Sequence, residues 1–201
     1  MIINQFLDEA AEVLKDSAPA NTILLRGFSK FPAIPTMASL YKLNPAAIAN
    51  YPMYRGLAKL LGMTVLDVGP DASALSDVLE KHIGDHDFFY IHFKKTDSAG
   101  EDGDFERKVS AIEEFDRSLP RLLPLNPDVL VVTSDHSTPA LWKGHSWHPN
   151  PFLLVSKTSR LDGLTSFSEK ECARGSLGRF EARFAMPLML AHAGKLKKFG
   201  A

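Results

Sequence analysis

Two polar stretches of this sequence hold the side-chain types that most often bind metal ions. In the first, "VVTSDHSTPALWKGHSWHP", Asp135 and His136 follow an apolar run closely, and His145 comes nine residues after His136. Carboxylate oxygen and imidazole nitrogen together form a ligand set suited to Zn, Mn and similar divalent ions. The pair is equally compatible with a structural role, in which Asp135 accepts the imidazole proton. His145 favours the metal site over that alternative.

The second stretch, "HFKKTDSAGEDGD", places four carboxylates between positions 97 and 104. Carboxylates this close repel one another unless a cation or solvent relieves them. We expect Asp97 and Glu101 to face one ion across a tight turn at Gly100. An Asx-turn at Asp97 is the alternative, and Asp104 is expected to cap the helix that follows it.

The elements that position these stretches alternate between helix and strand. Apolar spacing and capping residues predict the helices, and short apolar runs between turn signals predict the strands. "FPAIPTM", residues 31–37, has two prolines and is an extended connector, so we place a domain break near residue 40. Helices are expected over 1–17, 44–62, 72–84, 103–123 and 179–194, and strands over 22–28, 64–69, 87–93, 128–134 and 151–156.

Strands that are apolar throughout and alternate with helices are typical of an α/β fold. We predict a mostly parallel sheet with helices on both faces. In such sheets functional groups gather at the carboxyl ends of the strands. The two polar stretches follow the strands predicted at 87–93 and 128–134, so we expect functional groups at these two strand ends.

Composition narrows the class of protein. The chain has 201 residues, is 45% hydrophobic and has a formal net charge of −1. That balance favours neither a nucleic acid nor a membrane surface as partner. The single Cys172 excludes an internal disulfide, and there is no apolar run long enough for a signal or membrane segment. We therefore expect a cytoplasmic protein.

Several segments together resemble the archaeal-type, cofactor-independent (2,3-bisphosphoglycerate-independent) phosphoglycerate mutases of the alkaline phosphatase superfamily. The resemblance covers nearly the whole chain, and the segments occur in the family's order. They are "ANTILLRG", "AAIANYPMYRGLAKLLGM", "HFKKTDSAGEDGD", "TSDHSTPALWKGHSWHPNPFLL" and "ARGSLGRFEARFAMPLMLAHAGKLKKFGA".

This resemblance implies a three-layer, alkaline-phosphatase-like core and the interconversion of 3-phosphoglycerate and 2-phosphoglycerate in glycolysis or gluconeogenesis. It also implies two divalent ions, with Mn expected and Zn, Co or Mg as alternatives, and a serine that carries the phosphoryl group between steps. Asp135 and His136 would bind the ion nearer the serine, and Asp97 and His145 the other.

Two basic residues are candidates for binding the substrate. Arg26, in "LLRG", matches an arginine that the family directs at the charged groups of the substrate, and a surface ion pair is its alternative role. Lys94 is a further substrate-binding candidate, with exposure to solvent as its alternative.

The chain departs from the family pattern at position 101, where Glu101 stands in place of a metal-binding histidine. A carboxylate ligand favours harder ions, so we expect weaker Zn binding at that site. Family members are also about twice as long, and neither their early Asp-Gly motif nor their serine nucleophile is visible here. We therefore assign no catalytic residue in this chain.

We expect the chain to correspond to the C-terminal half of a family member. Residues 1–40 would be the tail of an inserted substrate-capping domain, and residues 41–201 the C-terminal part of the metal-bearing core. A sheet lacking its first strands exposes an edge, which predicts pairing with the missing half or self-association. There are two alternatives to the mutase function. The chain could be part of another phosphohydrolase or phosphomutase of the superfamily, or a non-catalytic remnant that needs a partner.

Overall fold

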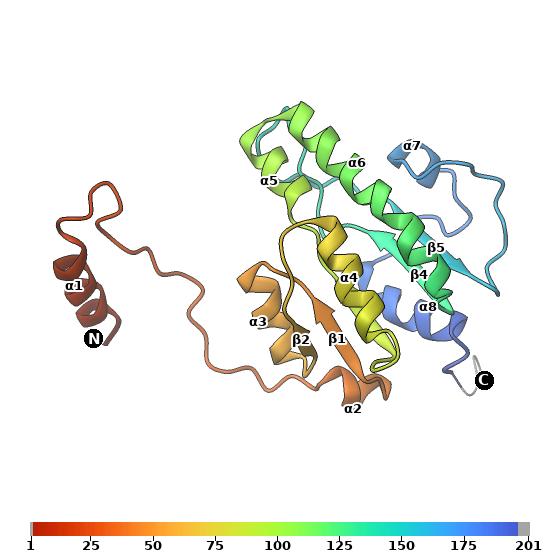
Figure 1. Cartoon of the computed structure of the whole chain (residues 1–201), viewed down its shortest axis with the longest axis horizontal. Helices are drawn as coiled ribbons and strands as arrows, with labels where there is room; N and C mark the ends of the chain where they lie inside the picture. The colour runs from red at the N-terminus through yellow and green to blue at the C-terminus, as the bar shows by residue number, and fades with distance from the viewer. Residues whose placement is uncertain (1, 197–201) are drawn as a thin grey trace. The chain divides into compact units, whose positions relative to one another are not determined.

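The computed structural model describes residues 2–196, and the chain divides into two units, Met1–Ile34 and Pro35–Ala201 (Figure 1). The division falls inside the Pro-rich connector at 31–37. The end of the last family-like segment, residues 197–201, lies outside the described range. Within that range, none of the helices combines the length and the apolar character needed to cross a membrane.

The first unit contains one helix, α1 (Ile2–Leu14), where the sequence predicts one. The strand predicted at 22–28 is wrong, because residues 21–36 form no regular secondary structure. A strand is stable only when a neighbour satisfies its backbone hydrogen bonds, and this segment pairs with none in its unit. Most of its apolar side chains are exposed, with Leu24 at 93%.

A three-stranded parallel sheet forms the centre of the second unit. Strand β1 (Pro45–Ile48) lies between β2 (Thr64–Leu66) and β3 (Phe88–Ile91), and both pairings are parallel. All four residues of β1 are buried. Asn44 joins the starts of β1 and β3, because its backbone N–H donates to Asp87 Oδ1 at 2.7 Å.

The helix predicted over 44–62 is therefore wrong in its first part. Residues 45–48 form the central strand, and the helix, α3 (Pro52–Leu60), begins at Pro52. A short run in which every residue is apolar shows no hydrophobic periodicity, so its sequence cannot distinguish a buried strand from a buried helix. Proline suits the first turn of a helix, and here Pro52 rather than Pro45 occupies it.

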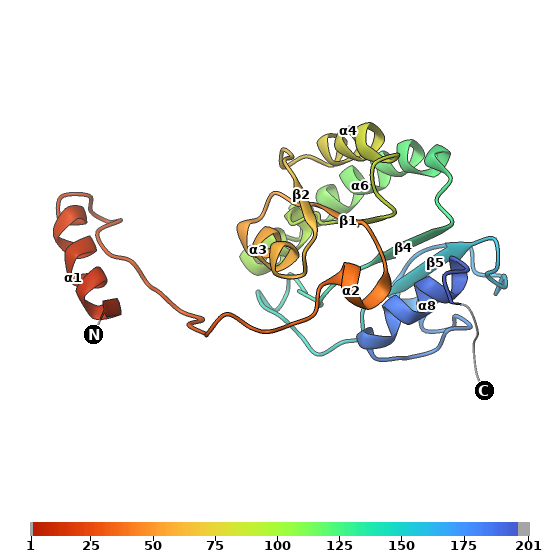
Figure 2. The same cartoon turned by 90° about the horizontal axis from the view of Figure 1, so that it is seen from below.

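Helices cover both faces of the sheet. Consecutive residues of β1 point to opposite sides, so that Ala47 belongs to one apolar cluster and Ile48 to another. The first cluster packs against α2 (Met37–Tyr41), α3 and α8 (Ala185–His192), and the second against α4 (Ala72–His82) and α6 (Phe105–Leu122), as Figure 2 shows. Complete burial of a side chain such as Ile48 contributes about 1.5–3 kcal/mol. The predicted α/β architecture with helices on both faces is confirmed.

Two further strands form a separate antiparallel pair, β4 (Val129–Thr133) with β5 (Phe152–Ser156). A parallel return would need a crossover, usually helical, whereas residues 134–151 contain no helix, and the chain turns back beside β4. The remaining short elements are η1 (Leu123–Leu125), α7 (Glu169–Cys172) and η2 (Ala182–Phe184). The helix predicted over 179–194 begins at Ala185 and has Pro187 in its first turn.

Candidate metal centre

The polar stretch after β3 forms a helix, α5 (Lys95–Asp102), so the predicted turn at Gly100 is wrong. The helix places Asp97 and Glu101 one turn apart on the same face. The turn comes instead at Gly103, whose positive φ of 74° ends the helix. Asp104 caps α6 as predicted, because its side chain accepts a hydrogen bond from the Arg107 N–H at 3.0 Å.

Gly100 allows α5 to lie directly against the loop that follows β4. A Cβ atom at this position would lie 2.4 Å from the backbone oxygen of Thr138. Any side chain would therefore push the helix and the loop apart. Since Asp97 is on the helix and His136 on the loop, this close approach brings the two predicted metal-binding stretches together.

The loop after β4 folds back so that its two histidines meet. A bridge between Ser137 and Ser146 closes the loop, with the Ser146 N–H donating to the Ser137 carbonyl at 2.9 Å. The rings of His136 and His145 then lie 3.8 Å apart between centroids.

Three of the five predicted metal ligands converge on one point. Asp97, His136 and His145 each offer one ligand atom, and these atoms lie within 4.8 Å of one another. Asp97 Oδ1 lies 3.7 Å from His145 Nε2, and the His136 ring lies beside it with Nδ1 at 3.7 Å. This donor set, one carboxylate with two imidazoles, fits a divalent transition metal or zinc.

Each of the other two predicted ligands lies beside one of the two histidines. Glu101 Oε1 lies 3.5 Å from His145 Nε2, and Asp135 Oδ2 lies 3.5 Å from His136 Nε2. All five residues thus form one connected cluster, although Glu101 and Asp135 stand outside the converging three.

Lys94 supplies the positive charge nearest to this cluster. Its ammonium group forms an ion pair with Asp97 and lies 3.9 Å from Glu101 Oε2. Burial alone would raise the pKa of Asp97, but hydrogen bonds from Lys94 and Thr138 outweigh it and hold that pKa below its ordinary value. Asp97 therefore remains ionised, as a metal ligand must be.

Thr138, which the sequence did not single out, organises the centre. It is buried, and its hydroxyl donates to Asp97 Oδ1 at 2.5 Å. The hydroxyl has one hydrogen, so its 3.0 Å contact with His136 Nδ1 has the imidazole as donor. That hydrogen bond occupies His136 Nδ1, so Nε2 is the ring nitrogen that remains available to a metal ion. The only sequence signal was a threonine two residues after the Asp-His pair.

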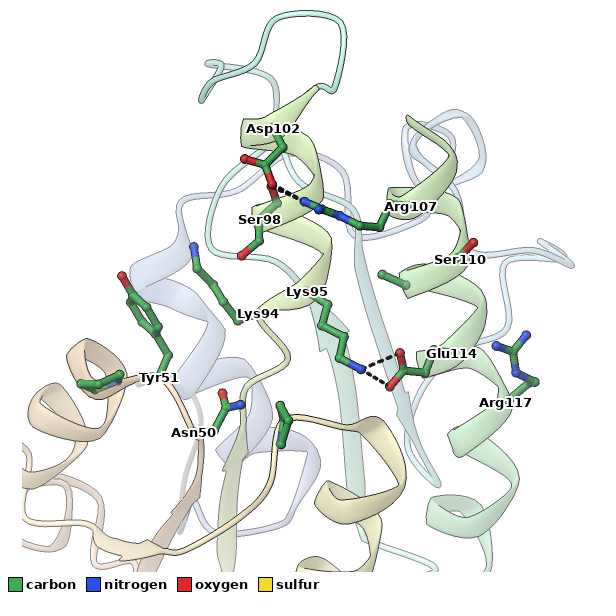
Figure 3. Close-up of a pocket in the computed structure, with 13 residues that line it drawn as sticks. Asn50, Tyr51, Lys94, Lys95, Ser98, Asp102, Arg107, Ser110, Glu114 and Arg117 are labelled. Atoms are coloured by element: carbon green, nitrogen blue, oxygen red, sulfur yellow. Dashed lines mark hydrogen bonds and ion pairs between the residues drawn. The ribbon is translucent and has the colours of Figure 1, made fainter. Parts of the chain in front are cut away.

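A pocket of about 760 Å³ lies beside α5, which lines it together with part of α6 (Figure 3). Lys94 lies between the pocket and the metal-ligand cluster, with its ammonium group 5.1 Å from the centre of the Tyr51 ring. Lys95 enters the pocket from α5 and pairs with Glu114 at 2.9 Å. The lining comprises Asn50, Tyr51, Pro52, Pro70, Lys94, Lys95, Ser98, Asp102, Arg107, Ser110, Ala111, Glu114 and Arg117.

Arg26, the other predicted substrate-binding residue, is exposed in the first unit. The two units are not placed relative to each other, so its predicted role stays a prediction.

The cluster has the donor set of a divalent metal site, and the comparison with known protein families agrees with that interpretation. Residues 12–192 match the family model described as the Metalloenzyme superfamily, and the chain belongs to this family. It is similar to the probable 2,3-bisphosphoglycerate-independent phosphoglycerate mutase of Thermotoga maritima, with 53% identity over 200 residues, which are 100% of this chain and 50% of that protein. The protein of the same name from Thermus thermophilus is 53% identical over 203 residues, again 100% of this chain and 50% of its own length.

Two solved structures extend these similarities. The structure of the PH0037 protein from Pyrococcus horikoshii has a TM-score of 0.88 at 30% identity, over 100% of this chain and 58% of that one. The cofactor-independent phosphoglycerate mutase from Thermoplasma acidophilum has a TM-score of 0.66 at 28% identity, over 96% of this chain and 52% of that one. The chain spans about half the length of the curated relatives it matches.

Proposed function

We propose that this chain is the metal-binding half of a cofactor-independent phosphoglycerate mutase, which interconverts 3-phosphoglycerate and 2-phosphoglycerate. The observation that carries this proposal is the convergence of Asp97, His136 and His145 within a chain that is similar over its whole length to proteins of that name. The serine that would carry the phosphoryl group is expected in the half of those relatives that this chain does not match.

The chemistry of the cluster supports divalent metal ions as cofactors. Asp97, His136 and His145 would hold one ion, and Glu101 and Asp135 are placed to complete it or to bind a second. When bound, such ions polarise phosphoryl oxygens and activate a hydroxyl nucleophile. Three carboxylates among five ligands favour Mn over softer metals.

Lys94 would position an anionic substrate beside the metal-ligand cluster. It lies between the cluster and the pocket, so a phosphate or carboxylate group in the pocket could replace Asp97 as its partner. Charge-assisted hydrogen bonds of this kind are short and strong. Arg26 would supply a second contact from the first unit.

The unpaired edges of β3 and β4 support a partner for the second unit. Among the described residues each strand has a hydrogen-bonded neighbour on one side only. Neither strand has the charged residues or prolines that usually protect an edge strand from pairing with another chain. Strand β3 is half-buried, whereas the equally apolar β1 is fully buried. We propose that the half of the relatives that this chain does not match covers these edges, or that a second copy of the chain does.

The test is reconstitution. The purified chain is mixed with the N-terminal half of the Thermotoga maritima relative in Mn²⁺, and formation of 2-phosphoglycerate is followed. We expect mutase activity in the mixture and none with either half alone. Release of inorganic phosphate without isomerisation would favour a phosphohydrolase instead, and a mixture that binds together without either activity would favour a non-catalytic remnant.

A further inference from the structure

Tyr54 makes a contact with the metal-ligand cluster that none of its predicted residues explains. It lies on α3, and its hydroxyl donates a hydrogen bond to Asp135 Oδ2, which belongs to the loop after β4. The two residues are 81 positions apart in the chain. A hydrogen bond to an ionised carboxylate is among the stronger ones in proteins.

The ring of Tyr54 is held in place by a second aromatic ring. It stacks on His92 with 3.8 Å between ring centroids and an angle of 27° between the ring planes. His92 follows β3 and is itself fixed, because its backbone N–H donates to the carbonyl of Ile48 at 3.0 Å. Stacking on His92 beside the central sheet thus holds the Tyr54 ring where its hydroxyl reaches Asp135.

This contact fixes the second oxygen of Asp135. Oδ1 already accepts a hydrogen bond from the backbone N–H of His136 at 3.1 Å, while Oδ2 lies 3.5 Å from His136 Nε2. The Asp135 side chain is exposed, and without Tyr54 its one remaining hydrogen bond among the described residues would be the contact of Oδ1 with the His136 N–H.

We propose that Tyr54 is a positioning residue that holds the Asp135 carboxylate against the metal-binding nitrogen of His136 and so sets the metal affinity of that side of the cluster. The inference rests on the proposed metal site and adds a residue to it. Partners that orient metal ligands in this way typically change metal affinity by about 10–100-fold when they are removed.

The test compares Tyr54→Phe with Tyr90→Phe in the purified chain. Tyr90 is a neighbouring tyrosine, 6.5 Å from Tyr54 between ring centroids, and serves as the matched control. Calorimetric titration with Mn²⁺ should show about tenfold weaker binding for Tyr54→Phe. Tyr90→Phe should bind as the wild type does. The visible spectrum of the Co²⁺-loaded chain should also change for Tyr54→Phe alone, since it reports the ligand geometry.

Asp135→Asn completes a double-mutant cycle. If Tyr54 acts through Asp135, adding Tyr54→Phe to Asp135→Asn should cause little further loss of Mn²⁺ affinity. Wild-type affinity in Tyr54→Phe, or additive losses in the double variant, would overturn the role of Tyr54 and leave the metal site standing. No Mn²⁺ binding by the wild-type chain would overturn the metal site as well.

Discussion

Replacing Gly100 by alanine should destabilise the chain, although alanine is the better helix former. In an unobstructed helix the exchange stabilises by about 1 kcal/mol. At Gly100 the new Cβ would lie 2.4 Å from the carbonyl oxygen of Thr138 and 3.0 Å from the Cγ2 atom of the same threonine. Thr138 cannot move aside cheaply, because its hydroxyl donates to Asp97 and its carbonyl accepts from Lys108 at 2.5 Å.

Overpacking of this kind costs about 1–3 kcal/mol, and the fixed backbone oxygen places Gly100 at the upper end. The free energy of unfolding should fall by about 2 kcal/mol, because an overpacking cost of about 3 kcal/mol is partly offset by a helix-propensity gain of about 1 kcal/mol. Mn²⁺ affinity should fall as well, since the displaced helix carries Asp97 away from His136.

Gly56 provides the matched control. It also lies inside a helix, α3, but a Cβ there meets nothing within 4 Å. Urea unfolding should therefore show Gly56→Ala about 1 kcal/mol more stable than the wild type, against the loss at Gly100. Equal stability of the two alanine variants would refute the close packing of α5 on the loop after β4.

Two further predictions concern the charges of the cluster. The folded-state pKa of Asp97 is depressed below 3.8, so its contribution to stability is present above that pH and is lost as the pH falls through the folded pKa. In urea unfolding without metal, the wild type should be more stable than Lys94→Met at pH 6. This difference in stability should become smaller below about pH 4. A difference that does not change with pH would contradict the contact between Lys94 and Asp97. Glu101→His should bind Zn²⁺ several times more tightly than the wild type by calorimetry, and equal affinities would count against Glu101 as a ligand.

Local patterns in the sequence predict most of the helices and the strand ends at which the site lies. The periodic helices α1, α4 and α6 are present within a few residues of their predicted ends. The sequence predicts helix where β1 lies, because four buried residues are too few to show a period. The direction of β5 and the pairing of strands also depend on contacts between distant segments, which no local pattern records.

Some residues of the candidate site could likewise be predicted from the sequence, and others could not. Asp97, His136 and His145 could be named from residue type and from their place after apolar strands, and the structure brings them together. Thr138 and Tyr54 could not, because a threonine or a tyrosine has no metal-binding signature of its own. Their importance comes from hydrogen bonds to residues 41 and 81 positions away, which only the folded chain reveals.

Calorimetric titration of the purified chain with Mn²⁺ tests whether His136 belongs to a divalent metal site. His148 is the matched control, because it lies in the same loop but outside the converging three and bonds to Ser146. We predict that the wild type and His148→Ala bind Mn²⁺ alike and that His136→Ala binds at least about tenfold more weakly. Absence of binding in the wild type, or equal binding by the two alanine variants, would contradict the account.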